Sequence, residues 1–138
     1  MKVTCSTIKI RTHGEGDIVD LTLHVREVAK QSGILDGIVH LFVIGSTAAI
    51  TTIEYEPGLV GDMGKTLERL IPKGAGYDHE MAWGDDNGHS HLRASLIGPS
   101  LTVPLVGGDL KLGTWQQIVL LEMDTRPRQR EVLAQVLG

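Results

Sequence analysis

The change in hydrophobic periodicity along the chain is the feature that most limits its fold. Residues 20–32 and residues 58–71 carry apolar side chains at helical spacing, the first with Leu21, Val25 and Val28 on one face. Later segments are short, rich in β-branched residues, and separated by glycine and proline. Because helices come early and strands follow one another late, the sequence predicts an α+β fold with antiparallel sheets.

Strands are expected at the start of the chain, between the helices and throughout the second half. Residues 2–12 are expected to form the first strand. Residues 37–57 have two apolar halves, one on each side of Gly45 and Ser46, and these form either two strands or one bent strand. Residues 129–137 are ambiguous, since their composition favours a helix. The other predicted strands are residues 90–98, 100–106, 109–111 and 114–123, with Gly107-Gly108 as a hairpin turn. Residues 73–88, rich in glycine and acidic residues, are expected to be a long functional loop.

Composition excludes several classes of protein. The 138 residues fit one domain, residues 1–138. The net charge of −4 argues against nucleic-acid binding, and no apolar run approaches the ~20 residues of a membrane span. The single cysteine, Cys5, excludes an internal disulfide and favours a cytoplasmic location.

His89 and His91 are the first candidates for a functional site. On a strand, residues two apart point to the same face, so the two imidazoles can share one metal ion. His79 can serve as a third ligand, and Asp85 or Asp86 can supply an oxygen or orient a histidine. Two alternatives stay open: a solvated histidine pair, and an anion site in which the histidines act with Arg93.

Residues 45–49, GSTAA, are a second candidate. Ser46 and Thr47 offer hydroxyl groups, and the backbone N–H groups can hold an anion; the alternative is a bulge or tight bend. Three acids, Glu54, Glu56 and Asp62, can bind Mg²⁺ or act as a base, or they can simply suit the helix dipole. Trp115 can stack on a flat ligand or pack in the sheet.

One region resembles a known family. The stretch HSHLRASLIGPSLTVPLVGGDLKLGTWQQIVLLEMD is similar to the signature region of the YjbQ family, and the likeness extends to STAAITTIEYEP, Asp62, GYDHE and the C-terminal residues. The resemblance implies a β-sandwich of two mostly antiparallel sheets with two helices, and homotrimers packed around a three-fold axis. It also implies that residues 129–137 are a strand. Some members are assigned a secondary thiamine-phosphate synthase activity, which joins a pyrimidine pyrophosphate to a thiazole phosphate and releases pyrophosphate.

The resemblance also assigns site residues by position. It places catalytic groups at Glu54, His79 and His91, to which we add Arg93. It implies that Asp62, Trp115 and Gln116 line the cleft, and we add Ser46 and Thr47 as ligand-binding candidates. The family pattern has a histidine where this chain has Gly45, and many members lack a histidine at His89. We therefore hypothesise that His89 replaces the missing imidazole in a metal group with His79 and His91, which would hold Zn²⁺ or Mg²⁺.

Three functions remain open at this level. The first is a small soluble enzyme, a pyrophosphate-releasing transferase of the thiamine-phosphate synthase type. The second is a metal- or phosphometabolite-binding homotrimer without turnover, and the third is a structural oligomer. The expected partners are other copies of the chain and a small phosphorylated molecule, with no nucleic acid and no membrane.

Overall fold

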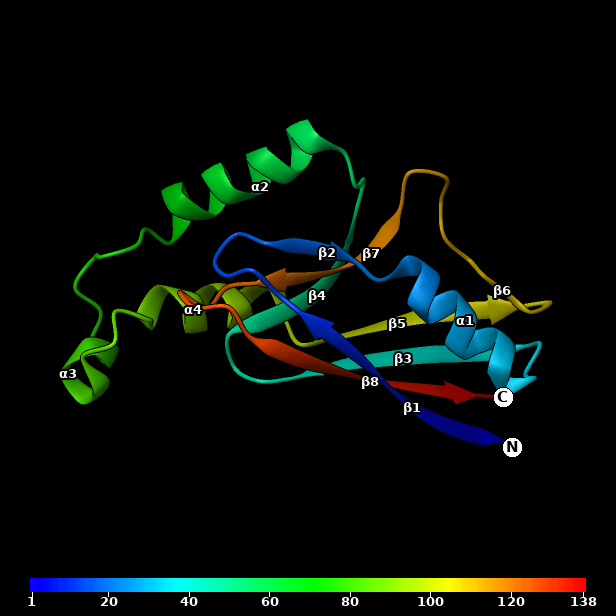
Figure 1. Cartoon of the computed structure of the whole chain (residues 1–138). Helices are drawn as coiled ribbons and strands as arrows, with labels where there is room; N and C mark the ends of the chain where they lie inside the picture. The colour runs from blue at the N-terminus through cyan, green and yellow to red at the C-terminus, as the bar shows by residue number, and fades with distance from the viewer.

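Two antiparallel sheets form the framework of the protein, whose computed structural model describes residues 1–138 (Figure 1). The larger sheet has the order β1-β8-β3-β5-β6: β1 (Val3–Arg11), β8 (Gln129–Leu137), β3 (Gly37–Ile44), β5 (Ser100–Val106) and β6 (Asp109–Leu110). The smaller sheet has the order β2-β7-β4: β2 (Ile18–Asp20), β7 (Gln117–Glu122) and β4 (Ala48–Ile53). Every strand pair is antiparallel, which confirms the predicted fold class.

The main core lies between the two sheets and the first helix. Side chains of β3, such as Leu41, alternate into it and meet Ile50 of β4 and Leu120 of β7. The helix α1 (Thr22–Ser32) buries Val25 in the same core. Figure 1 shows α1 close to the two chain termini and α3 at the opposite end of the molecule.

A second core covers the other face of the smaller sheet. Val119 and Leu121 of β7 point into it, because residues that alternate along a strand face opposite sides. Two helices close it: α2 (Pro57–Leu70) through Leu67 and α4 (Gly88–Ile97) through Ala94. Each face of the smaller sheet is therefore buried, which explains its nearly continuous run of apolar residues.

Most of the predicted elements are present. The strand at the start, the two amphipathic helices, the strands on either side of Gly45 and the hairpin at Gly107-Gly108 are confirmed. Residues 129–137 form β8, which is hydrogen-bonded on both edges, to β1 and to β3. Packing of Val132 and Val136 in the core outweighs the helix propensity of this segment.

The prediction of a strand over residues 90–98 is wrong, because this segment belongs to α4. Its buried residues include the pairs His89 and Arg93, and Ser90 and Ala94; the members of each pair lie four positions apart and so share a helix face. Leucine, arginine and alanine are also strong helix formers. The alternation of histidine with serine was a misleading signal.

The predicted loop over residues 73–88 contains a short helix, α3 (His79–Trp83). Gly84 ends it with a left-handed backbone, at φ 63°. The fold therefore has four helices rather than the two that the resemblance implied.

The outer face of the larger sheet is covered by no other element. Three side chains of β3 point outward there, with exposed fractions of 39% for Ile38, 42% for Phe42 and 53% for Ile44. Leu133 and Leu137 of β8 pair with Phe42 and Ile38 on this face. No helix of the protein has the length and apolar character needed to cross a bilayer.

Candidate metal and ligand site

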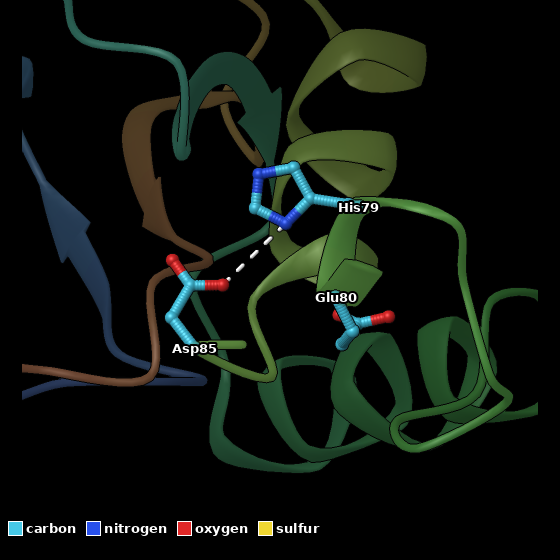
Figure 2. Close-up of side chains that lie close together, drawn as sticks. All are labelled: His79, Glu80 and Asp85. Carbon is cyan, nitrogen blue, oxygen red and sulfur yellow. Dashed lines mark ion pairs between the residues drawn. The ribbon is translucent and has the colours of Figure 1, made fainter. Parts of the chain in front are cut away.

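His79, Glu80 and Asp85 form the one group in the protein with the donor types and spacing of a metal site. One potential ligand atom from each residue lies within 4.8 Å of the other two. Figure 2 shows a carboxylate oxygen of Asp85 facing a ring nitrogen of His79, with Glu80 to one side. Nδ1 of His79 lies 3.4 Å from Oδ1 of Asp85 but makes no hydrogen bond. His79 and Glu80 belong to α3, and Asp85 lies in the turn that follows it.

Two buried polar atoms of this group have no partner. They are Nδ1 of His79 and Oε2 of Glu80. The other carboxylate oxygen of Glu80 accepts a hydrogen bond from the Gly88 N–H at 2.9 Å, which joins α3 to the start of α4. Since buried polar groups are normally satisfied, a cation held between these atoms would account for both vacant lone pairs.

His91 extends the group toward a pocket. Its ring centroid lies 4.6 Å from that of His79, with the planes tilted by 42°. His91 also lines a pocket of about 280 Å³ that Ser46 borders from the β3–β4 turn. The structure therefore brings together three of the predicted site residues, His79, His91 and Ser46.

His89 faces a different partner. It is fully buried, and its Nε2 lies 2.7 Å from Oε1 of Glu15 in the β1–β2 loop. Because α4 is a helix, residues two apart differ by about 200° around its axis, so the same-face argument for His89 and His91 is wrong. A metal group that includes His89 loses the geometric argument on which it rested.

The carboxylate of Glu15 contacts three side chains that are cationic or carry an imidazole. Besides His89, it accepts hydrogen bonds from Lys73 at 3.1 Å and from Arg93 at 3.5 Å. Burial would raise the pKa of Glu15, but the hydrogen bonds from Lys73 and His89 outweigh it and leave the pKa below its ordinary value. The cluster fixes α4 against the β1–β2 loop.

Arg93 is occupied by structural contacts. Its guanidinium donates to the Ile71 carbonyl at 3.0 Å and to the Glu68 carboxylate at 2.8 Å, and it is buried. These contacts tie α4 to the end of α2. A phosphate could reach this guanidinium only by displacing its present partners.

Thr47 lies in a buried polar network rather than at an open site. Its hydroxyl donates to Asp124 at 2.9 Å and accepts from Arg130 at 2.8 Å. Burial would raise the pKa of Asp124, but hydrogen bonds from the Arg126 N–H, Thr47, Arg128 and Asn87 lower it to about 2.

The predicted residues Glu54 and Trp115 lie together but away from the histidines. Both line a surface pocket of about 430 Å³ beside the start of α2, and 72% of Trp115 is exposed. Figure 1 places the β6–β7 loop, which carries Trp115, at the end of the molecule opposite α3. A single chain therefore does not bring Glu54 and His79 into one cleft.

The two remaining candidates have different surroundings. Gln116 donates to the Thr52 hydroxyl at 3.1 Å and accepts from the Gly113 N–H at 3.0 Å, so it holds the β6–β7 loop against β4. Asp62 is exposed on α2.

Sequence reasoning missed the buried network that Arg130 and Glu122 form. Nε of Arg130 donates to Oε2 of Glu122 at 2.8 Å, and Nη2 donates to Oε1. The signal was present, since Arg130 has the same strand parity as the buried Val132, Ala134 and Val136.

The fold defines the class of protein: an α+β domain of two antiparallel sheets, with a histidine and carboxylate group on the helices at one end. The family model described as UPF0047 protein YjbQ-like matches residues 6–138. The chain therefore belongs to the YjbQ (UPF0047) family.

Relatives support this assignment over the whole length. A UPF0047 protein of Methanothermobacter thermautotrophicus is 40% identical over 138 residues, which cover 100% of this chain and 94% of the relative. The crystal structure of a YbjQ-like protein of unknown function from Sulfolobus solfataricus superposes with a TM-score of 0.93 at 35% identity, covering 99% of this chain and 98% of the other. A hypothetical protein from Aeropyrum pernix has a TM-score of 0.90 at 34% identity, with 98% of each chain covered.

Replacement of Asp124 by asparagine will reduce stability most at neutral pH. The native carboxylate has its pKa lowered from 3.8 to about 2, so its contribution is complete above pH 3.8 and is lost as the pH falls through 2. The deficit of Asp124→Asn in free energy of unfolding should therefore shrink by ~2 kcal/mol over this window. Urea titrations between pH 7 and pH 2 measure it, with the exposed Asp109→Asn as control. Parallel stability curves for Asp124→Asn and the native protein would contradict the prediction.

Proposed function

We propose that this protein binds a divalent transition-metal ion at His79, Glu80 and Asp85 and, with that ion, the phosphate group of a small molecule. The observation that carries the proposal is the pair of unpartnered buried atoms, Nδ1 of His79 and Oε2 of Glu80, in a group of suitable spacing. Imidazole and carboxylate ligands together suit Zn²⁺ better than Mg²⁺, which prefers oxygen alone.

The position of His91 supports the second half of the proposal. It stands against His79 on one side and lines the pocket on the other, so a ligand in the pocket is next to the metal group. Three protein ligands leave a coordination position open, and a phosphate oxygen can occupy it. The bound cation would supply a positive charge that this acidic group lacks by itself.

A second candidate is the transferase activity of the thiamine-phosphate synthase type. His91 favours it, because an imidazole beside both the metal group and the pocket can donate a hydrogen bond to a leaving pyrophosphate. In this reaction the thiazole nitrogen forms a bond to the pyrimidine methylene carbon, and pyrophosphate leaves with the electron pair of the broken C–O bond. Glu54 and Arg93 would have to be left out of such a site within one chain.

We also infer that the chain forms a homotrimer through the outer face of its larger sheet. The resemblance implies this assembly, and the uncovered apolar side chains Ile38, Phe42 and Ile44 support it. Exposed apolar patches on a sheet commonly mark interfaces between chains.

Removal of the His79 imidazole will weaken zinc binding. The native chain should bind one Zn²⁺, and His79→Ala or Asp85→Asn should raise the dissociation constant at least ~10-fold by removing a ligand. The affinity should also fall as the pH falls, because the imidazole must be neutral to bind. Isothermal titration measures both effects. His13→Ala is the matched control, since His13 also pairs with an aspartate, Asp17, at 3.3 Å but is exposed. Equal losses in His13→Ala and His79→Ala would refute the site.

Pyrophosphate release tests the transferase separately from binding. The protein is incubated with the pyrimidine pyrophosphate and the thiazole phosphate in the presence of Zn²⁺ or Mg²⁺. A transferase should release pyrophosphate in step with the joined product, and His91→Ala should lower the rate ~100-fold or more, as expected for loss of a group that assists a leaving group. If no product forms while zinc binding is intact, the transferase is excluded and the binding function stands.

A charge on the outer sheet face will separate the subunits. Phe42→Glu or Ile44→Glu should convert a particle with three times the mass of one chain into single chains, because three carboxylates would be buried without partners. Light scattering after size exclusion gives the mass. Leu23→Glu, at a position that is 80% exposed on α1, is the control and should leave the mass unchanged. A native protein that is already a single chain would overturn the trimer.

A further inference from the structure

A separate cavity lies beside α1, at the end of the molecule opposite α3. Its volume is about 280 Å³, and it is bordered by α1, by the residues that connect α1 to β3, and by the hairpin that joins β5 to β6. Figure 1 shows α1 next to β6 and away from α3, and this α1 cavity shares no residue with the pocket of His91. Its charged lining residues are Arg26, Lys30 and Asp109, and its buried apolar ones are Ala29, Ile34 and Leu110.

The floor of the α1 cavity is apolar and fixed. Ala29, Ile34 and Leu110 all belong to the main core of the protein. Pockets that bind small molecules are usually lined by apolar side chains with a few polar groups that orient the ligand. Such pockets measure ~300–1,000 Å³, so a cavity of this volume suits a small ligand.

Two cations without an anionic partner lie above this floor. Arg26 and Lys30 both line the cavity, and neither takes part in an ion pair of the protein. They lie four positions apart on α1, so their side chains are neighbours on the helix surface, where two like charges are destabilising. The nearby acid of the same helix, Glu27, accepts a hydrogen bond from Gln31 instead.

The helix dipole accounts for only one of the two cations. Lys30 lies in the last turn of α1, where the free carbonyl groups favour a positive charge. Arg26 lies one turn earlier, outside the range of this effect. An anion bound between the two side chains would relieve their repulsion.

The charge of the lining indicates the class of anion. Asp109 of β6 also lines the cavity but forms no ion pair with either cation, so two cations and one acid give the lining a net charge of +1. A single carboxylate balances this charge, whereas a phosphate dianion would leave an excess of negative charge beside Asp109. The guanidinium of Arg26 can also bind both oxygens of a carboxylate.

We propose that the α1 cavity binds a small monocarboxylate, with its charged end between Arg26 and Lys30 and its apolar body on the floor of the cavity. This is a second ligand site and does not rest on the proposed metal and phosphate site, because the two share no residue.

Titration with 4-methylpentanoate, a branched aliphatic carboxylate, tests the site. The native protein should bind one molecule per chain, and the uncharged 4-methylpentanamide should bind at least ~10-fold more weakly. Arg26→Gln and Lys30→Gln should each raise the dissociation constant about fivefold, as expected for a partly exposed charge pair, whereas Asp109→Asn should lower it. Lys111→Gln is the matched control, because it removes an exposed positive charge near Asp109 but outside the lining, and it should change the constant less than twofold.

Backbone amide signals provide a readout that needs no variant. Gly33 and Gly108 line the cavity, so their N–H signals should shift on titration and saturate with the same dissociation constant, while the signal of Gly64 in α2 stays in place. Arg26→Gln should melt no lower than the native protein, because it removes a repulsion, so its weaker binding would not reflect unfolding.

Three results would each overturn the inference: no saturable binding to the native protein, equal binding of the amide and the carboxylate, or a loss in Lys111→Gln as large as that in Lys30→Gln. Phenyl phosphate that shifts Gly33 and Gly108 and binds there more tightly than the carboxylate would overturn the assigned class of ligand.

Discussion

The buried ion pair between Arg130 and Glu122 is the interaction on which the rest of the structure depends. Arg130 lies in β8 of the larger sheet and Glu122 at the end of β7 in the smaller one, so the pair joins the two sheets at one edge of the core. Removing one partner of such a pair costs about 3–5 kcal/mol, because the other charge stays buried. The same guanidinium also holds Thr47, which sets the course of the β3–β4 turn and places Gly45 at the pocket.

The helices at one end of the molecule depend on a second set of charges. Glu15 forms hydrogen bonds with His89 and Arg93 of α4. Glu68, near the end of α2, also accepts a hydrogen bond from Arg93. These contacts orient α4 so that His91 faces His79 and the pocket. His89 and Arg93 are thus held by Glu15 and Glu68, and these contacts help to orient α4. The short helix α3 depends on the same region through the Glu80 contact to the Gly88 N–H.

The separation between the histidines and Glu54 has a consequence for function. Within one chain, Glu54 and His91 line different pockets, so chemistry that needs both the acid and the imidazole would require a neighbouring chain to supply one of them. The uncovered face of the larger sheet offers a surface for such a neighbour, and Phe42 belongs both to this face and to the pocket. The uncovered face of the larger sheet and the pocket are thus adjacent in space.

Local patterns in the sequence determined much of the fold. The spacing of apolar residues defines α1 and α2, and Gly107-Gly108 defines the hairpin, because each depends on neighbours a few residues away. The same reasoning failed for α4, where the alternation of His89, Ser90 and His91 suggested a strand although the buried positions follow a helical period. The composition of β8 favoured a helix, and only its place between β1 and β3 makes it a strand.

The site was only partly determined by the sequence. The histidines and Asp85 stand out as residue types, and the family resemblance drew attention to His79 and His91. The tertiary structure decided which of them meet: His79 pairs with Asp85 and His91, while His89 turns to Glu15. It also decided that Arg130 lies beside Gly45, 85 positions away in the chain. Such contacts depend on how two sheets and four helices pack, and no local pattern of residues encodes that packing.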